Sequence, residues 1–278
     1  MTTATARPGT DPAAAHQRPG FGRLLLAEWT KIRTVRSTLW SLILLVVLDL
    51  GFTTLIVGLT TAQWDDASPA DRAQIAADPV SFILGSGFFL SQLAICVLGV
   101  LVIASEYSTG MIRASLLAVP RRLPMLWAKA IVFALVVLVL GVAVSFASFF
   151  IGAAISSDTV EVSLGDQGVL RAVIGGGLYL AMLGLFALAV GAIVRHTAGG
   201  ITGVIAFVLV LAPLTTLLPG SVGDHVHAYL PSEAGNLIAK AHQGPDDLLT
   251  PWQGYGVFAL WTAALLAIAA FLLKRRDA

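Results

Sequence analysis

The stretch SEYSTGMIRASLLAVPRRLPMLWAK, residues 105–129, is the polar interval around which this chain is organised. It follows directly on a run without charged residues, so we expect Glu106 to lie where a membrane helix leaves the hydrocarbon. Gly110 permits a sharp change of direction, and apolar residues then recur at helical spacing until Pro120 ends the segment. The pattern predicts a short amphipathic helix at the membrane surface, between two membrane spans.

The composition indicates a membrane protein. Of the 278 residues, 57% are apolar and only 12% are charged, whereas charged residues make up roughly a quarter of an average soluble domain. The net charge of +1 argues against nucleic acid as a partner. The single cysteine, Cys96, lies in an apolar run, which excludes an intrachain disulfide and cysteine-based metal motifs. We therefore expect no metal site.

Six apolar runs are long enough to cross the hydrocarbon core, which takes about 20 residues. Unpaired backbone amides are too costly in lipid, and strict alternation of apolar and polar residues is missing, so these runs are expected to be helices. The predicted fold is an all-α polytopic membrane protein with one domain, residues 21–278, after a disordered cytoplasmic tail, residues 1–20. The expected spans are residues 39–61, 82–104, 130–155, 172–194, 199–218 and 254–273.

The lysines and arginines set the expected orientation. With a cytoplasmic N-terminus, all 17 basic residues lie inside except Arg72, Arg171 and Lys240, while acidic residues gather in the outer segments. Both termini are therefore predicted to be cytoplasmic, in a multi-pass protein of the cell membrane. Ahead of the first span, residues 21–37 combine apolar and charged side chains in the manner of an N-terminal interfacial helix, lying in the plane of the membrane surface.

Two further helices are expected in the outer segments. Ser68 followed by Pro69 suits the cap and first position of a helix that ends before Pro79. In the longer outer segment, residues 219–253, Ser232 is expected to cap a second helix. The second helix has two interpretations, which stay open: it closes the outer end of a pathway, or it is a surface helix without consequence for transport.

One charged residue lies deep inside a predicted span. Asp49 is about ten residues, or roughly 15 Å, into the first span, which is near the bilayer midplane. An ionised aspartate there is unfavourable by about 2.5–3.5 kcal/mol, so Asp49 is expected to face the protein interior, to line a wet path or to be protonated. It is either a pathway-lining or proton-responsive group, or a neutral carboxyl that is hydrogen-bonded to a Ser or Thr of a neighbouring helix.

Residues 106–129 follow the pattern Glu106-Tyr107-x-x-Gly110-x-Ile112-Arg113-x-x-Leu116-x-x-x-Pro120-x-Arg122, with Lys129 further on. This pattern resembles the first cytoplasmic loop of bacterial ATP-binding-cassette permeases of the type 2 exporter class, and the likeness extends to the six-span layout. The resemblance implies a coupling helix between spans two and three that seats on an ATPase subunit. An amphipathic connector that rests on lipid headgroups would give a similar pattern. The residues assigned to ATPase coupling by the resemblance are Glu106, Gly110, Met111, Ile112, Arg113, Leu116, Pro120 and Arg122.

The chain carries no nucleotide-binding motif of its own. A P-loop ends in Gly-Lys-Ser/Thr, and none of the four lysines follows a glycine. We expect no cofactor on this chain and ATP on a partner subunit, and hydrolase motifs such as Gly-x-Ser-x-Gly are also missing. The resemblance implies two protein partners, a P-loop ATPase and a second permease subunit, within the lipid bilayer.

Together with the resemblance, these features predict the membrane-spanning permease subunit of an ATP-driven exporter, not an enzyme. Three alternatives remain open. An ion-coupled secondary transporter would use Asp49 as its coupling site. A membrane anchor or sensor would recruit a cytoplasmic protein without moving solute, and an intramembrane enzyme would depend on Ser221 or His225.

Overall fold

The computed structural model describes residues 20–108, 110, 122–217, 219–244 and 247–275, which form helices and connecting turns without a strand. Six of the described helices are long and apolar enough to cross a membrane, as in a multi-pass membrane protein. Each of the six predicted spans coincides with one of these helices, so the all-helical architecture with six candidate spans is confirmed. The six are α2 (Arg36–Ala62), α4 (Pro79–Ser108), α6 (Arg122–Ser156), α7 (Val169–Val194), the composite helix α8–η2–α9 (Thr197–Thr215) and α12 (Pro251–Arg275).

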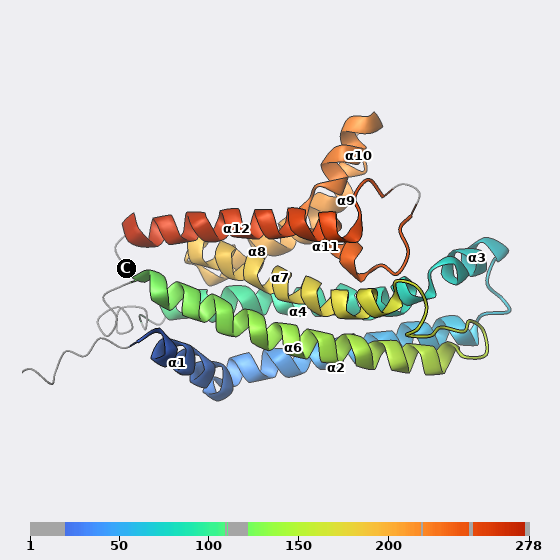
Figure 1. Cartoon of the computed structure of the whole chain (residues 1–278), viewed down its shortest axis with the longest axis horizontal. Helices are drawn as coiled ribbons and strands as arrows, with labels where there is room; N and C mark the ends of the chain where they lie inside the picture. Colours follow the sequence, from blue (N-terminus) through green and yellow to red (C-terminus); the bar gives the residue numbers. More distant parts are fainter. Residues whose placement is uncertain (1–19, 109, 111–121, 218, 245–246, 276–278) are drawn as a thin grey trace, which may run out of the picture.

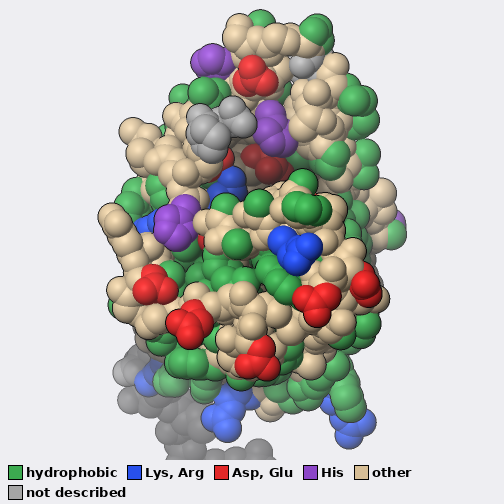
Figure 2. Space-filling model, turned by 90° about the vertical axis from the view of Figure 1, so that its right-hand side faces the viewer, with side chains coloured by type: hydrophobic (Ala, Val, Ile, Leu, Met, Phe, Trp, Pro, Cys, Tyr) green, Lys and Arg blue, Asp and Glu red, His purple; other side chains and the backbone are tan. Residues whose placement is uncertain are grey.

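The long helices lie side by side along one axis, and both described chain ends lie at the same end of the bundle (Figure 1). Helix α1 (Phe21–Thr34) is at this end, which we refer to as the basic end. Helix α3 (Pro69–Ala77) is at the opposite end. The N-cap prediction for α3 is confirmed, because the Asp71 amide donates a hydrogen bond of 3.1 Å to the Ser68 hydroxyl. Figure 2 views the end that carries α3 and shows acidic side chains distributed over it.

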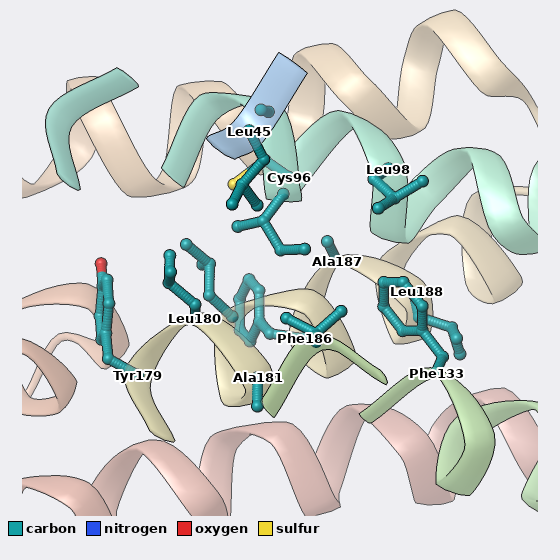
Figure 3. Packing of buried hydrophobic residues seen from close by; sticks show 14 of the residues in the cluster. Leu45, Cys96, Leu98, Phe133, Tyr179, Leu180, Ala181, Phe186, Ala187 and Leu188 are labelled. Atoms are coloured by element: carbon teal, nitrogen blue, oxygen red, sulfur yellow. The ribbon is translucent and has the colours of Figure 1, made fainter. Parts of the chain in front are cut away.

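Helix α7 is the central element and packs against α4, α6 and α12. Figure 3 shows buried side chains of neighbouring helices packed around it, among them Cys96 of α4 and Phe133 of α6. The crossing of α4 over α7 depends on a glycine. A Cβ atom at Gly99 would lie only 2.6 Å from the Gly184 carbonyl oxygen, so a larger residue would push the two helices apart.

The fifth span is not a regular α-helix. Helix α8 (Thr197–Ile205) continues into the π-helix η2 (Ala206–Leu211), and a single turn, α9 (Ala212–Thr215), completes the span. Pro213, which has no amide hydrogen, is the second residue after the π-helix. A run of apolar residues predicts a span here but not this change of helix type.

The segment between the last two spans folds back onto the bundle. It forms α10 (Gly220–Ala228), α11 (Pro231–Asn236) and the 3-10 helix η3 (Leu237–Ala239), and the last two of these pack against α7 and α12. Backbone approaches backbone closely, because a Cβ at Gly175 would overlap the Ile238 carbonyl. The Arg171 guanidinium donates hydrogen bonds to the carbonyls of Ile238 and Ala241, at 3.3 and 2.9 Å.

The predicted capping role of Ser232 is wrong. Helix α11 begins at Pro231 with Leu230 at the N-cap, because proline at the first position already provides the helical φ angle. The Ser232 hydroxyl is buried and has no hydrogen-bond partner among the described residues. The predicted tail lies outside the described residues, apart from Gly20.

Candidate functional site

Four ionisable side chains meet at the basic end of the bundle. Glu28 and Lys31 belong to α1, Glu106 to the last turn of α4, and Lys129 to α6. The Lys129 ammonium lies 2.7 Å from Glu28 Oε2 and 2.9 Å from Glu106 Oε1. The Lys31 ammonium lies 2.7 Å from Glu28 Oε1 and 2.9 Å from Glu106 Oε1. Each lysine thus binds both carboxylates, and we refer to this closed ring of alternating charges as the charge cluster.

Most of the charge cluster is removed from solvent. Lys129 is 3% exposed, and Glu28 and Glu106 are each 5% exposed. The Lys31 side chain is the most accessible member, at 31%. Transfer of a charge out of water is unfavourable by several kcal/mol, and such groups are retained only when they are paired and hydrogen-bonded. Two lysines and two glutamates balance each other, so α1, α4 and α6 are joined by a neutral ionic contact.

The spacing of residues along α1 accounts for the position of Glu28. Leu24, Glu28 and Ile32 are four residues apart and are the buried residues of this helix. Glu28 therefore lies within the apolar stripe that packs on the bundle, and Lys31 lies three residues further on. Burial by itself lowers the pKa of Lys31, whereas the hydrogen bonds to Glu28 and Glu106 and their negative charges raise it. The net result is a pKa above the ordinary value of 10.5.

A cavity of about 330 Å³ adjoins the charge cluster, between α1, the start of α2 and the last turns of α4. Its lining combines Glu106 and Lys129 with apolar residues such as Leu98 and Val35. Glu106 Oε2 is buried and has no hydrogen-bond partner among the described residues. The space beside the cluster means that α1 is held to the spans by its ionic contacts and by part of its apolar face, not by close packing along its whole length.

A second cationic residue joins helices at the same end. The Arg195 guanidinium lies 5.0 Å above the ring of Tyr107, the residue that follows Glu106. It also donates a hydrogen bond of 3.4 Å to the Leu272 carbonyl of α12. The last turn of α4 is therefore connected to α1 and α6 by the charge cluster, and to the ends of α7 and α12 by Arg195.

The structure places some of the residues predicted for ATPase coupling. Glu106 is in the charge cluster, Gly110 has a positive φ of 70° that suits the expected change of direction, and the backbone of Arg122 begins α6. The others lie outside the described residues, and they are Met111, Ile112, Arg113, Leu116 and Pro120.

Asp49 faces the protein interior and is fully buried. The Ser148 hydroxyl of α6 donates a hydrogen bond of 2.5 Å to Asp49 Oδ1. The backbone of α4 closes over the carboxyl group, since a Cβ at Gly87 would lie 2.7 Å from the same oxygen. Asp49 Oδ2 and the Thr53 hydroxyl have no hydrogen-bond partner among the described residues. Asp49 and the charge cluster are separate features, one inside the bundle and one at its basic end.

A polar cavity of about 460 Å³ lies near α10 and α11. His227 Nε2 lies 3.6 Å from Glu233 Oε2 there, and His227 Nδ1 lies 3.0 Å from the Thr215 hydroxyl. Within the described ranges, no group of three or more His, Cys, Asp or Glu side chains is placed to hold a metal ion. Ser221 and His225, on which an intramembrane enzyme would depend, lie on α10. His225 Nδ1 contacts the backbone carbonyl of Ser221, at 2.6 Å.

The sequence interpretation did not predict that Glu28 and Lys31 pair with Glu106 and Lys129. A signal was present, because a glutamate between Leu24 and Ile32 in an apolar stripe indicates a buried partner. No protein-family model matches the chain, and no curated protein matches its sequence. An assignment of function therefore depends on the residues and geometry described above.

Proposed function

We propose that this chain is the membrane-spanning subunit of an ATP-driven exporter of the ATP-binding-cassette type 2 class, and that a separate P-loop ATPase moves it. The resemblance of residues 106–129 to the coupling loop of such permeases suggests the class. The observation that carries the proposal is the charge cluster, because the two helices that flank this loop both contribute to it and both bind α1 through it.

In the proposed mechanism, the ATPase pushes on the loop between α4 and α6. The push is transmitted to Glu106 on one side of the loop and to Lys129 on the other, and both are bound to α1. Separating a buried ion pair is unfavourable by about 3–5 kcal/mol, so the three helix ends would move as one unit. Helix α1 would lie in the cytoplasmic membrane interface, and the adjoining cavity leaves room for it to shift.

Movement of these helix ends would tilt the spans to which they belong. Helix α4 packs against α7, and α7 against α12, so a tilt of α4 reaches the centre of the bundle. Two copies of the permease, or two related ones, would form the pathway between them. ATP is bound and hydrolysed by the partner, and the permease changes no covalent bond.

The test is affinity purification of the tagged full-length chain from its native membrane. A P-loop ATPase is expected to co-purify in comparable amount. Arg113→Glu is expected to reduce its recovery about tenfold, because the predicted coupling helix would then carry the opposite charge. The matched control is Arg72→Glu, a partly exposed arginine of α3 at the other end of the bundle. Absence of an ATPase from the wild-type preparation, or its full retention by Arg113→Glu, would contradict the proposal.

One observation favours a second candidate, an ion-coupled secondary transporter. The Asp49 carboxyl is buried and one of its oxygens, Oδ2, has no partner among the described residues. Such a transporter would work without an ATPase. Purified protein alone in liposomes would then take up solute when a pH gradient is imposed.

A further inference from the structure

An apolar groove of about 670 Å³ runs along the outside of the bundle between α1, α2 and α6. Its volume is within the range of about 300–1,000 Å³ in which small-molecule sites occur. Trp29 of α1 forms one wall, and the opposite wall includes Leu135 and Val139 of α6. These three side chains are 43%, 56% and 71% exposed, so the groove is open and its lining is accessible.

The length of the groove matches one leaflet of a bilayer. From Ile131 to Ala143 the groove follows α6 for about 18 Å, at about 1.5 Å of rise per residue. Half of a hydrocarbon core of about 30 Å is about 15 Å. The groove begins at α1, which is at the basic end, and extends from there toward the middle of the spans. A single acyl chain of the leaflet at the basic end would therefore fill it lengthwise.

Positive charge lies at the α1 end of the groove. The Arg33 guanidinium lies 5.7 Å above the ring of Trp29, which itself lines the groove. Whereas Lys31 is engaged in the charge cluster, Arg33 is exposed and forms no ion pair with any residue that the structure describes. A guanidinium binds a phosphate by two parallel hydrogen bonds, and it is the cation best suited to do so at an interface.

We propose that this groove is a binding site for one anionic phospholipid. One acyl chain lies along α6 against Leu135 and Val139, and the headgroup phosphate is bound by Arg33 beside Trp29. The apolar lining alone would accept any lipid, and the charge of Arg33 selects an anionic one. The bound lipid would hold the outer face of α1, whose opposite face is held by the charge cluster. The inference does not depend on the proposed transport function.

The test is native mass spectrometry of the purified, delipidated full-length chain during titration with phosphatidylglycerol or phosphatidylcholine of identical acyl chains. One tightly bound phosphatidylglycerol per chain is expected, with phosphatidylcholine bound at least about tenfold more weakly. Arg33→Gln is expected to weaken phosphatidylglycerol about tenfold, to the level of phosphatidylcholine. Val139→Trp is expected to weaken both lipids, because the indole occupies the acyl path.

Two matched variants serve as controls. Arg275→Gln removes a guanidinium that lies 4.4 Å above the ring of Phe271 on α12, away from the groove. Leu260→Trp adds an indole at a residue of α12 that is 72% exposed and also lies outside the groove. Both are expected to bind phosphatidylglycerol as the wild type does. All four substituted residues are exposed, so each variant is expected to keep the fold.

Three outcomes would overturn the proposal. Equal binding of the two lipids would mean annular lipid only. Equal behaviour of Val139→Trp and Leu260→Trp would exclude the groove as the acyl site. If glycerophosphate, at the same concentration as the lipid, displaced phosphatidylglycerol, the site would bind phosphate without needing an acyl chain.

Discussion

Lys129 is 3% exposed and binds the carboxylates of two other helices at once. In Lys129→Met, the volume is largely kept, but Glu28 and Glu106 are left with Lys31 as their only cationic partner in the charge cluster. We expect the free energy of unfolding to fall by about 3–5 kcal/mol, because an uncompensated charge stays buried. Chemical unfolding of the purified protein in detergent micelles would measure this loss.

Lys240 provides the matched control for Lys129. Lys240 forms an ion pair with Asp247 at 2.9 Å, but its side chain is 37% exposed. Lys240→Met is therefore expected to change the free energy of unfolding by only about 0–1 kcal/mol. If both variants lost a similar free energy of unfolding, burial of the charge cluster would not increase its contribution to stability.

Substitution of Asp49 distinguishes the two proposed functions, an ATP-driven permease and an ion-coupled transporter. Asp49→Asn keeps an oxygen that can accept the hydrogen bond from Ser148. If Asp49 is a neutral structural carboxyl, we expect Asp49→Asn to change stability and transport little. Asp49→Leu should lower the free energy of unfolding by about 1–3 kcal/mol, because the Ser148 hydroxyl loses its partner. Loss of transport in a normally folded Asp49→Asn protein would favour ion coupling.

Individual residues could be predicted from the sequence where their position depends on the local chain. Glu106 follows an apolar run, and it is found at the end of a span as expected. Its pairing with α1 could not be predicted, because Lys31 is 75 residues away in the sequence and only the packing of the helices brings the two together. Asp49 shows the same limit: a serine partner could be expected, but not that it would be Ser148.

At the scale of secondary-structure elements, the segment formed by α11 and η3 depends on a glycine of α7. In Gly175→Ala, the new methyl group would overlap the Ile238 carbonyl, which is backbone and cannot turn away. We expect the segment to lift from α7, with a loss of about 1–3 kcal/mol in the free energy of unfolding. Hydrogen exchange should become faster in residues 231–241.

The control for this element is Gly51→Ala in α2, where a Cβ meets no atom within 4 Å. Alanine is the better helix former by about 0.5–1 kcal/mol, so this variant should be as stable as the wild type or more so. Unchanged hydrogen exchange in Gly175→Ala would contradict the described docking of η3 on α7.

The two predicted caps show why helix starts are only partly predictable. Ser68 is followed directly by Pro69, and both take the expected positions at the start of α3. Ser232 instead comes after Pro231, so the helix has already begun when the serine is reached. The order of serine and proline decides between these outcomes, and burial then leaves the Ser232 hydroxyl inside the fold.

For the whole molecule, the expected orientation can be tested by labelling single cysteines. The natural Cys96 is 1% exposed, so the wild type should stay unlabelled. Ala70→Cys at the α3 end is expected to react with an impermeant maleimide on intact cells, and Thr34→Cys at the basic end only after the membrane is opened. The reverse pattern would place the proposed coupling loop outside the cell, where no ATPase could reach it.

The six-helix architecture could be predicted because a membrane span is defined by the length and apolarity of one continuous run. The neighbours of each helix could not be predicted in this way. Every span has a similar composition, and close contacts such as that of Gly99 with Gly184 appear only when both helices are seen together. The π-helix also has no signature in a run of apolar residues.

That π-helix has a geometric consequence for the fifth span. A π turn holds more residues than an α turn, so regularising η2 into an α-helix would rotate everything beyond it by roughly 100°, about the angle of one helical residue. The rotation would occur about the axis of the span, without unfolding it. Helix α10 projects sideways from the bundle (Figure 1), so this rotation would swing it around the axis of the fifth span to a different side.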